Sequence, residues 1–538
     1  MNRIYKVIYS KARQCAMVVS ELAKSSQNSS RKGADHAGTP ALARIIAAAL
    51  AVGALTWGSA FSVSQAADVN GIVKTDDGSL KSVNAALTYD GSNTNGQIAL
   101  GNNATVFIGK GGQERVISPT GQAKDAAGGI AIGSNTYART GSIMIGSHNY
   151  KGDMGDIQNI DTSKFDTRET GAYGHTVAST TIGTNSFTKG FLATTVGDYN
   201  IQSGRTEGWG ISSYYYGAQN FGATVLGTLN SNESATAPIK YKDYGSYKIQ
   251  QPSYSGIANS IVGTANKVNN SNGTLVFGAG NTVKNSITDI TGVSDTTSLK
   301  DANTAADTLR KAIKGSKSGG ATLVIGGGNE ATNTLKTQII GVNNTVTGTE
   351  DKPSDYNMVN AFGTEVTSSS HLYTIGDNNH ITDTTKTIVF GDNRYVSNTH
   401  DSIIIGSLDE SKGPQYTTAT DATIIGHNAN AWGNRSMALG KDVYTTGDDS
   451  VAIGSGAAAY SKNSIAIGSN SDTYHKTAVT DYSKDKPTVG GIAIGMGTQT
   501  NASYGTAIGY QAMVTNVDGY ALGSQASVST DKGVAIGY

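Results

Sequence analysis

A short apolar triplet ending in glycine returns every 14 residues within residues 421–469, and this period constrains the fold more than any other feature. The glycines are Gly426, Gly440, Gly454 and Gly468. A fixed short period indicates stacked units. Fourteen residues are too few for a helical hairpin but suffice for two short strands, each followed by a tight turn. Each repeat therefore predicts one coil of a β-solenoid.

The residues after each glycine support this interpretation. An Ala or Asn stands three residues later and a small or β-branched residue five residues later, as in Gly341, Asn344 and Val346. We expect the glycine to adopt a turn conformation that a Cβ disfavours, and Asn to tolerate the same left-handed region. The coil-turn glycines that the pattern predicts include Gly426, Gly440, Gly454, Gly468, Gly495, Gly509, Gly523 and Gly537.

Several predicted strands are apolar at consecutive positions, among them Ile403–Ile405 and Leu323–Ile325. A strand with one face in water alternates apolar and polar residues, so both faces of these strands need cover. One face fills the narrow coil, and the other fits a second copy of the chain, whose strands repeat at the same axial spacing. The pattern favours a parallel homo-oligomer but does not give the number of copies.

Charge and cysteine content exclude several classes of function. Residues 1–66 hold eight Lys or Arg against two acids, which leaves 33 of the 41 basic and 39 of the 41 acidic residues beyond them. A net-acidic chain argues against nucleic acid as a partner. The only cysteine, Cys15, lies in the first segment. We therefore expect neither disulfides nor a cysteine-based metal site in the rest of the chain.

The N-terminal segment predicts a secretory signal with a long basic region. Residues 1–26 have the pattern of a basic amphipathic helix, and Arg44 precedes an apolar run from Ile45 to Leu55. Small residues after this run predict cleavage between Ala66 and Ala67. The run is short for a membrane span, and a retained N-terminal anchor is the alternative interpretation.

Two motifs carry a resemblance to a known family. The leader MNRIYKVIYSKARQCAMVVSELAK resembles the extended signal peptide of Gram-negative autotransporters, and the Ala-Ile-Gly repeats resemble the head of YadA-like trimeric autotransporter adhesins. The resemblance implies secretion across the inner membrane, display at the outer-membrane surface, and adhesion by a homotrimeric head. The implied fold class is all-β, a left-handed parallel β-roll or β-solenoid.

The expected organisation has four parts. They are an extended signal peptide region (1–26), the remaining signal peptide (27–66), an N-terminal lead-in (67–97) with a short strand near 85–89, and a head of coils with loop insertions (98–538). The insertion at 299–314 has a helical pattern and is either a short helix on the roll or an irregular loop. The chain ends at Tyr538 within the repeats, so we expect the family's coiled-coil stalk and C-terminal membrane anchor to lie outside it.

No constellation of catalytic residues is evident, and we expect a non-enzymatic protein without cofactor or metal. The histidines beyond the leader are scattered and form no HExxH motif. Asp377–Asn379 follows a coil glycine, where turn formation outweighs calcium binding as an interpretation. The rival class is an enzyme acting on polysaccharide from a parallel β-helix, whose three-sided coils are longer than these.

Two insertions rich in Tyr, Trp, Ser and Gly are the candidate ligand-binding segments. Such residues give large contact areas at low entropic cost. The residues that we expect to contribute are Trp209, Tyr214, Tyr215, Tyr216, Tyr241, Tyr244, Tyr247 and Tyr254. The alternative is that these rings cover the roll or contact the next protomer. The expected function is adhesion to host cells, extracellular matrix or bacterial surfaces, with autoaggregation or capture of soluble host factors as alternatives.

Overall fold

The structure is a computed structural model that divides into two compact units, Met1–Ala66 and Ala67–Tyr538. It describes residues 5–10, 15–20, 72–74, 80–82, 86–89, 97–102, 104–108, 128–139, 141–149, 179–188, 190, 192–203, 220–233, 240–243, 248–251, 256–286, 306–307, 309–311, 314, 322–473 and 489–538. No helix within these ranges is long and apolar enough to cross a membrane.

The described part of the first unit is an antiparallel hairpin of β1 (Tyr5–Ser10) and β2 (Cys15–Ser20). The amphipathic helix predicted for residues 1–26 is therefore wrong over this stretch. β1 contains Val, Ile and two Tyr, and β2 contains two Val; β-branched and aromatic residues lose side-chain freedom in a helix and fit a pleated strand. This local preference outweighs the helical spacing of the basic residues.

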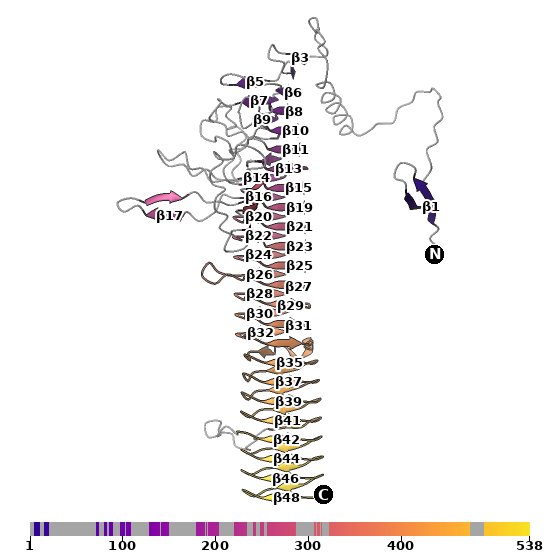
Figure 1. Cartoon of the computed structure of the whole chain (residues 1–538), viewed down its shortest axis with the longest axis vertical. Coiled ribbons are helices and arrows are strands. Elements are labelled where there is room, and N and C mark those ends of the chain that lie inside the picture. Colours follow the sequence, from indigo (N-terminus) through magenta and orange to yellow (C-terminus); the bar gives the residue numbers. More distant parts are fainter. Residues whose placement is uncertain are drawn as a thin grey trace. The chain divides into compact units, whose positions relative to one another are not determined.

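The second unit is a stack of short parallel strands, and one strand of each coil contributes to a first sheet that runs the length of the stack (Figure 1). The pairing begins with β3 (Ile72–Lys74) antiparallel to β4 (Leu80–Ser82), and β4 is parallel to β6. The first-sheet strands that follow are β6 (Ile98–Leu100), β8 (Ile130–Ile132), β10 (Ile143–Ser147), β11 (Thr180–Thr184), β13 (Thr194–Val196), β15 (Thr224–Thr228), β19 (Ser260–Thr264), β21 (Leu275–Ala279), β23 (Leu323–Gly327), β25 (Gln338–Val342), β27 (Met358–Phe362), β29 (Tyr373–Ile375), β31 (Ile388–Phe390), β33 (Ile403–Ile405), β35 (Thr423–Ile425), β37 (Met437–Leu439), β39 (Val451–Ile453), β41 (Ile465–Ile467), β42 (Ile492–Ile494), β44 (Thr506–Ile508), β46 (Tyr520–Leu522) and β48 (Val534–Ile536).

The second strand of each coil builds the opposite wall. Its longest sheet has 11 strands: β12 (Phe187–Thr188), β14 (Ile201–Ser203), β16 (Ser231–Glu233), β20 (Lys267–Asn269), β22 (Thr282–Lys284), β24 (Glu330–Thr332), β26 (Thr345–Thr347), β28 (Glu365–Thr367), β30 (His380–Thr382), β32 (Tyr395–Ser397) and β34 (Tyr416–Thr417). Three-stranded sheets are formed by β5 (Ala86–Tyr89), β7 (Thr105–Ile108) and β9 (Tyr137–Arg139); by β36 (Asn430–Ala431), β38 (Tyr444–Thr445) and β40 (Ala458–Ala459); and by β43 (Gln499–Thr500), β45 (Met513–Val514) and β47 (Ser527–Val528). We call all of these strands the second wall.

These pairings confirm the predicted all-β parallel solenoid. Successive first-sheet strands stack in register, so that Val324 lies beside Ile339 and Gly326 beside Gly341. The stack already includes part of the lead-in, because β4 pairs with β6 and β5 pairs with β7. A strand was expected near residues 85–89, and β5 occupies 86–89.

The core lies between the two walls and is one side chain deep on each. From β6 on, the second residue of each first-sheet strand points inward, as do Val324 and Ala452, and the middle residue of each three-residue second strand faces it, as does Val346. All three are fully buried. Because the two walls are so close, the coil has no room for a second apolar layer.

The glycine at the end of each first-sheet strand takes a conformation that a Cβ would oppose. Gly326 has φ +134°, and an added Cβ would overlap the backbone carbonyl of Gly341 in the next coil. The eight coil-turn glycines named above have φ between +123° and +142°. One coil departs from the pattern, because Ala361 stands in register with Gly341 and is not among the residues with positive φ.

The asparagines three residues after the glycine have a different role from the expected one. The left-handed region is occupied by the residue before them, such as Asn343 or Gly280, while Asn281 and Asn344 are not in it. Their amides are fully buried and stack into a ladder. Asn329 Nδ2 donates to Asn281 Oδ1 and to Gly341 O, both at 2.9 Å, and its Oδ1 accepts from Asn344. We call this the amide ladder; its members are Asn200, Asn230, Asn266, Asn281, Asn329 and Asn344, continued by Thr364 and Asn379.

The amide ladder ends at Arg394, which is fully buried. Its backbone N–H donates to Asn379 Oδ1 at 2.8 Å, and its guanidinium donates to the carbonyls of Gly406, Gly426 and Ala429. No carboxylate among the described residues is recorded beside it, and burial lowers the pKa of this guanidinium to about 10. Arg394 thus joins the coil below it to a coil that follows the 3₁₀ turn η6 (Glu410–Lys412).

Two insertions are described in part. The antiparallel pair β17 (Lys240–Asp243) and β18 (Lys248–Gln251) follows β16. Of the segment 299–314, the described residues 306–307, 309–311 and 314 are helical. Leu309 Cδ2 would lie 3.4 Å from a Cβ added at Gly222, so this side chain lies on the roll. The helix is therefore the alternative that these residues support.

Candidate functional site

The most extensive surface of the roll is an apolar column on the outside of the first sheet. It consists of the third residue of each first-sheet strand from Leu100 in β6 to Ile536 in β48, and we call it the outer ladder. The second residue of the same strands points inward and the third outward, so an all-apolar strand such as β33 has the burial pattern exposed, buried, exposed. The outward residues of such a strand are thus as apolar as its inward residue.

The exposure of the outer ladder is high for large apolar side chains. Ile375 is 44% exposed and Phe277 and Ile325 are each 40% exposed. The members on the described strands beyond β11 are Val196, Leu226, Val262, Phe277, Ile325, Ile340, Asn360, Ile375, Phe390, Ile405, Ile425, Leu439, Ile453, Ile467, Ile494, Ile508, Leu522 and Ile536. Monomeric proteins rarely expose so long a continuous apolar surface, which marks it as an interaction site.

The second wall presents a polar surface of mixed charge. His380 Nδ1 lies 3.1 Å from Glu365 Oε2, and its ring stacks on Tyr395 with centroids 4.8 Å apart. Tyr395 in turn meets Tyr416 edge to face at 5.5 Å. Farther along, Lys267 pairs with Glu233 at 3.3 Å. Both the His380–Glu365 and the Lys267–Glu233 contacts join neighbouring coils of the second wall.

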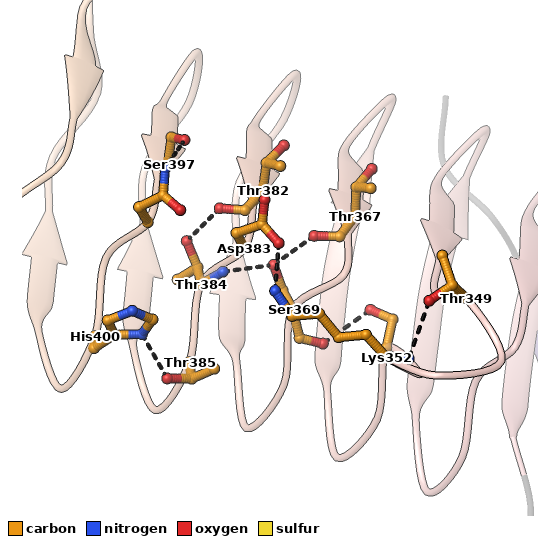
Figure 2. Close-up of polar contacts among 12 residues, drawn as sticks. Thr349, Lys352, Thr367, Ser369, Thr382, Asp383, Thr384, Thr385, Ser397 and His400 are labelled. Carbon is orange, nitrogen blue, oxygen red and sulfur yellow. Dashed lines mark hydrogen bonds and ion pairs between the residues drawn. The ribbon is translucent and has the colours of Figure 1, made fainter.

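The edge that leads from the second wall back to the first sheet is held by hydroxyl bonds between coils. Figure 2 shows Ser369 Oγ donating to Thr367 O at 2.8 Å and accepting from the backbone N–H of Thr384 at 3.0 Å. Lys352 reaches across the intervening coil to Asp383. Such exposed pairs contribute little stability. This edge is ordered by its short hydroxyl contacts rather than by charge.

A cation–aromatic stack stands on the same edge. Lys336 Nζ lies 4.2 Å from the centre of the Tyr356 ring, which stacks on His371 at 4.5 Å. Partial burial raises the pKa of the Asp355 carboxyl beside them, against the opposing effect of His371. These groups lie on consecutive coils and are held by one another.

The described residues offer no constellation for catalysis or metal binding. Within the ranges that the structure describes, no three His, Cys, Asp or Glu side chains gather around one point. Asp377 lies in the turn after β29, where its Oδ1 accepts the N–H of Phe362 at 2.9 Å, and Asn378 has φ +53°. The Asp377 carboxylate thus joins two neighbouring coils, and Asn378 takes a left-handed position in the turn.

Of the eight aromatic residues predicted as ligand contacts, the structure describes one. Tyr241 lies on β17, in register with Gln250 of β18. The other seven, Trp209, Tyr214, Tyr215, Tyr216, Tyr244, Tyr247 and Tyr254, lie outside the described residues, as do Ala66 and Ala67. Their role as ligand contacts stays a prediction.

Sequence reasoning missed two features of the described roll. The buried Arg394 occupies the position three residues after a glycine where Asn recurs, and this replacement is the signal that could have found it. The stack of His380 and Tyr395 follows from their equal places in adjacent 15-residue repeats.

Comparison with known families matches two parts of the chain. The family described as Extended Signal Peptide of Type V secretion system matches residues 1–50. The family described as YadA head domain repeat (2 copies) matches residues 418–442, 446–471 and 515–538. No curated protein matches the chain.

A leader of this type followed by head repeats indicates secretion and display on the outer-membrane surface of a Gram-negative bacterium. The roll described above is the structure in which the matched repeats lie, and YadA-like heads form homotrimers and bind host surfaces in general. Together the two matches give the chain the leader and the head repeats of a YadA-like trimeric autotransporter adhesin.

Proposed function

We propose that the roll is a non-enzymatic adhesive head in which two sister copies cover the outer ladder, while the second wall and the insertions meet other surfaces. The observation that carries this proposal is the outer ladder itself, which leaves Ile375, Ile405 and Ile425 between 37% and 44% exposed in a single chain. Covering such side chains stabilises the assembly by about 25 cal/mol for each Å² of apolar surface taken from water. Copies of the same chain fit this surface because their ladders repeat at the same spacing.

The assembly is tested by the molar mass of the chain after its leader, residues 67–538, measured by light scattering in solution. We expect a trimer. Ile405→Asp places a charge on the outer ladder and is expected to give monomers, because an unpaired carboxylate would be buried between copies. Thr367→Asp places the same charge on the second wall and should leave the trimer intact. A wild-type monomer with a stable fold would contradict the proposal.

The domain organisation follows from the same proposal. The leader, residues 1–66, is removed by cleavage between Ala66 and Ala67, and the lead-in 67–97 precedes the head 98–538. N-terminal sequencing of the chain recovered from the cell surface checks the cleavage site, and a start upstream of Ala67 would mean that part of the leader is retained.

For the ligand, we propose that the insertions 207–217 and 237–255 bind host-cell, matrix or bacterial surfaces through their aromatic residues. Their composition supports this, since Tyr and Trp give broad contacts with little entropic cost. Weak contacts repeated over three chains and many copies of the head give high avidity.

Deletion of residues 237–255 tests the ligand proposal. The matched control removes the equally long stretch 287–305, which has no aromatic residue. We expect the first deletion to weaken adhesion to cells, matrix or sister bacteria, and the control to retain it, with both variants trimeric. Equal adhesion by both trimeric variants would remove the insertion from the binding surface, and retained adhesion to bacteria alone would favour autoaggregation.

A further inference from the structure

The outer ladder contains one polar residue within the described strands. From β6 to β48 its members are Ile, Leu, Val or Phe, except for Asn360 in β27. Asn360 lies between Ile340 and Ile375 in the column and is exposed in the single chain. Among the described residues no hydrogen bond of its side-chain amide is recorded.

The surroundings of Asn360 are apolar. Phe362 lies two residues farther along β27 and therefore on the same face of the sheet, and it is 57% exposed. Val342, its register partner on β25, is 45% exposed. Where other coils continue the outward face with a turn residue such as Asp377, this coil continues it with Phe362. A covering chain would therefore place the Asn360 amide among apolar side chains.

A repetitive interface has a difficulty that an ordinary interface does not have. Consecutive members of the outer ladder are one strand spacing apart, about 4.8 Å. If one copy slides along another by one coil, nearly every Ile, Leu or Val meets another Ile, Leu or Val. Such a slip costs little apolar contact, so the apolar residues by themselves specify the axial register weakly.

We propose that Asn360 fixes the axial register of the sister copies in the assembled head. The inference rests on the proposed function, since it assumes that copies of the chain cover the outer ladder. In register, the Asn360 amides of all copies lie at one level, where each has a carbonyl to accept and an amino group to donate hydrogen bonds. After a slip of one coil, each amide faces Ile340 or Ile375 of its neighbour and loses its partners.

The same principle acts in coiled coils, where one buried polar residue specifies register at a cost in stability. Phe277 and Phe390 are the bulkiest members of the outer ladder, but a Phe beside an Ile leaves no polar group unpaired. Asn360 is therefore the member whose misplacement carries the larger penalty.

Cysteine cross-linking measures the register. Cys15 belongs to the leader, so the chain without its leader has no native thiol, and introduced cysteines are the only ones to react. Two tagged forms of residues 67–538 are co-expressed, one with Ile425→Cys and the other with Ile425→Cys, Leu439→Cys or Ile453→Cys. Ile425 and Ile453 are two coils apart, about 10 Å along the axis. Disulfides need Cα atoms within about 7 Å, so this mixed pair reports slipped chains.

We expect the wild-type background to cross-link the 425/425 pair and to give no 425/453 product. In Asn360→Ile the mixed 425/439 and 425/453 products appear, although the trimer persists and melts at a higher temperature. The double variant Asn360→Ile with Ile375→Asn moves the polar level by one coil in every copy. It should restore the wild-type pattern of cross-links.

Three results would overturn the inference. A single register in Asn360→Ile, with trimeric mass, would remove the role of Asn360 and leave the proposed assembly intact. Mixed products in the Asn360→Ile, Ile375→Asn double variant would mean that an Asn in each copy at any one level of the outer ladder is not enough, and that the register depends on position 360 itself. A monomeric wild-type chain would remove the assembly and this role together.

Discussion

The roll contains two kinds of coil that reach the same geometry with different chemistry. From Gly326 to Gly406 most coils are 15 residues long, and from Gly426 to Gly468 they are 14. The second residue of the first strand is Val or Ile in most of the longer coils, as at Val324 and Ile404, with Thr374 as an exception, and it is Ala in the shorter ones. The second strand has three residues in the longer coils and two in the shorter ones. We call these the long coils and the short coils.

The position three residues after the turn glycine separates the two kinds of coil further. In most long coils it holds the buried Asn of the amide ladder, with Thr364 and Arg394 as exceptions, and in the short coils it holds Ala429, Val443, Ala457 or Ser471. The long coils therefore bind each turn to the next through amide hydrogen bonds, while the short coils close the same space with small side chains. The residues matched by the YadA head repeat begin at 418 and include the short coils.

This difference teaches that the constant part of a coil is its turn geometry, not its core. Apart from the coil of Asn360 and Ala361, both kinds of coil place a glycine with φ above +110° at the end of the first strand and an apolar residue on the outer ladder. The core adapts in volume, from Val and Ile to Ala, as the second strand shortens. Replacing a residue that only one kind of coil uses should therefore destabilise the long coils and the short coils by different amounts.

The largest effect is expected where the two kinds of coil meet. Arg394→Met removes the guanidinium donors to the carbonyls of Gly406, Gly426 and Ala429, of which the Gly426 carbonyl keeps the Ala429 N–H at 3.4 Å. Each hydrogen bond from a charged donor contributes about 1.5 kcal/mol, so we expect a loss of about 4 kcal/mol. Hydrogen exchange should locate the loss in the coils that include residues 394–429.

Arg394→Lys is the matched control, because it keeps one charge but offers fewer donors with different geometry. It should recover only part of the loss. Full stability of Arg394→Met would mean that neighbouring groups or water satisfy the three carbonyls. Unfolding of the whole roll at once would contradict the expectation that solenoid coils depend chiefly on their neighbours.

The turn glycines give the next largest effect. Gly326→Ala forces a Cβ onto the carbonyl of Gly341 at φ +134°, whereas the Cβ in Gly454→Ala would lie 2.6 Å from the carbonyl of Gly468. We expect losses of about 3 kcal/mol and 2 kcal/mol, because an added Cβ has slightly more room at Gly454 than at Gly326. Thermal melting of the two variants measures the difference, and a larger loss in the short coil would reverse the comparison.

The amide ladder gives a moderate effect. Asn329→Ala removes two donated and two accepted hydrogen bonds inside a long coil. Ser471→Ala removes one bond, from Ser471 Oγ to the carbonyl of Gly468 at 3.0 Å, at the equivalent place in a short coil. We expect losses of about 2 kcal/mol and under about 1 kcal/mol. Equal denaturant midpoints for both variants would mean that the amide ladder adds nothing to packing.

The sequence predicted the coil but not its interior. Glycine spacing and the apolar triplets are local signals, and they gave the strands, the turn glycines and the outward apolar face of strands such as Ile403–Ile405. The buried amides and Arg394 depend on which neighbour stacks above, and insertions of variable length hide that neighbour in the sequence. A turn role for Asn281 and Asn344 was therefore inferred where a ladder exists.

Two further outcomes have different causes. Residues 1–26 satisfy a helical spacing of basic residues, yet β1 and β2 form because their β-branched residues favour strands over that stretch. The candidate ligand residues lie in insertions, where no repeat fixes the conformation. Asn360 could be recognised only after the register of β25, β27 and β29 had placed it in the outer ladder.

The smallest effect concerns the ion pairs between coils. Arg435 Nε lies 2.6 Å from Asp449 Oδ1, and its Nη2 donates to Oδ2 at 2.9 Å, so the short coils have a bidentate pair. Lys386 lies 3.5 Å from Asp401 in the long coils. The hydrogen bond from Arg435 lowers the pKa of the Asp449 carboxyl. Since this pair is exposed, we expect Arg435→Gln to lower the melting temperature slightly, and Lys386→Gln to lower it less.

The pH dependence of the melting temperature tests whether the charge of Asp449 causes the difference between Arg435→Gln and the wild type. A carboxyl whose pKa is lower in the folded state adds stability above its unfolded pKa and loses it as pH falls through the folded pKa. The difference in melting temperature between Arg435→Gln and the wild type should therefore be present at pH 7 and vanish in acid, below the ordinary range of an aspartate. High salt should shrink it as well. A difference that persists in both conditions would mean that Arg435 stabilises the short coils by packing its aliphatic stem, as a neutral side chain of equal length would.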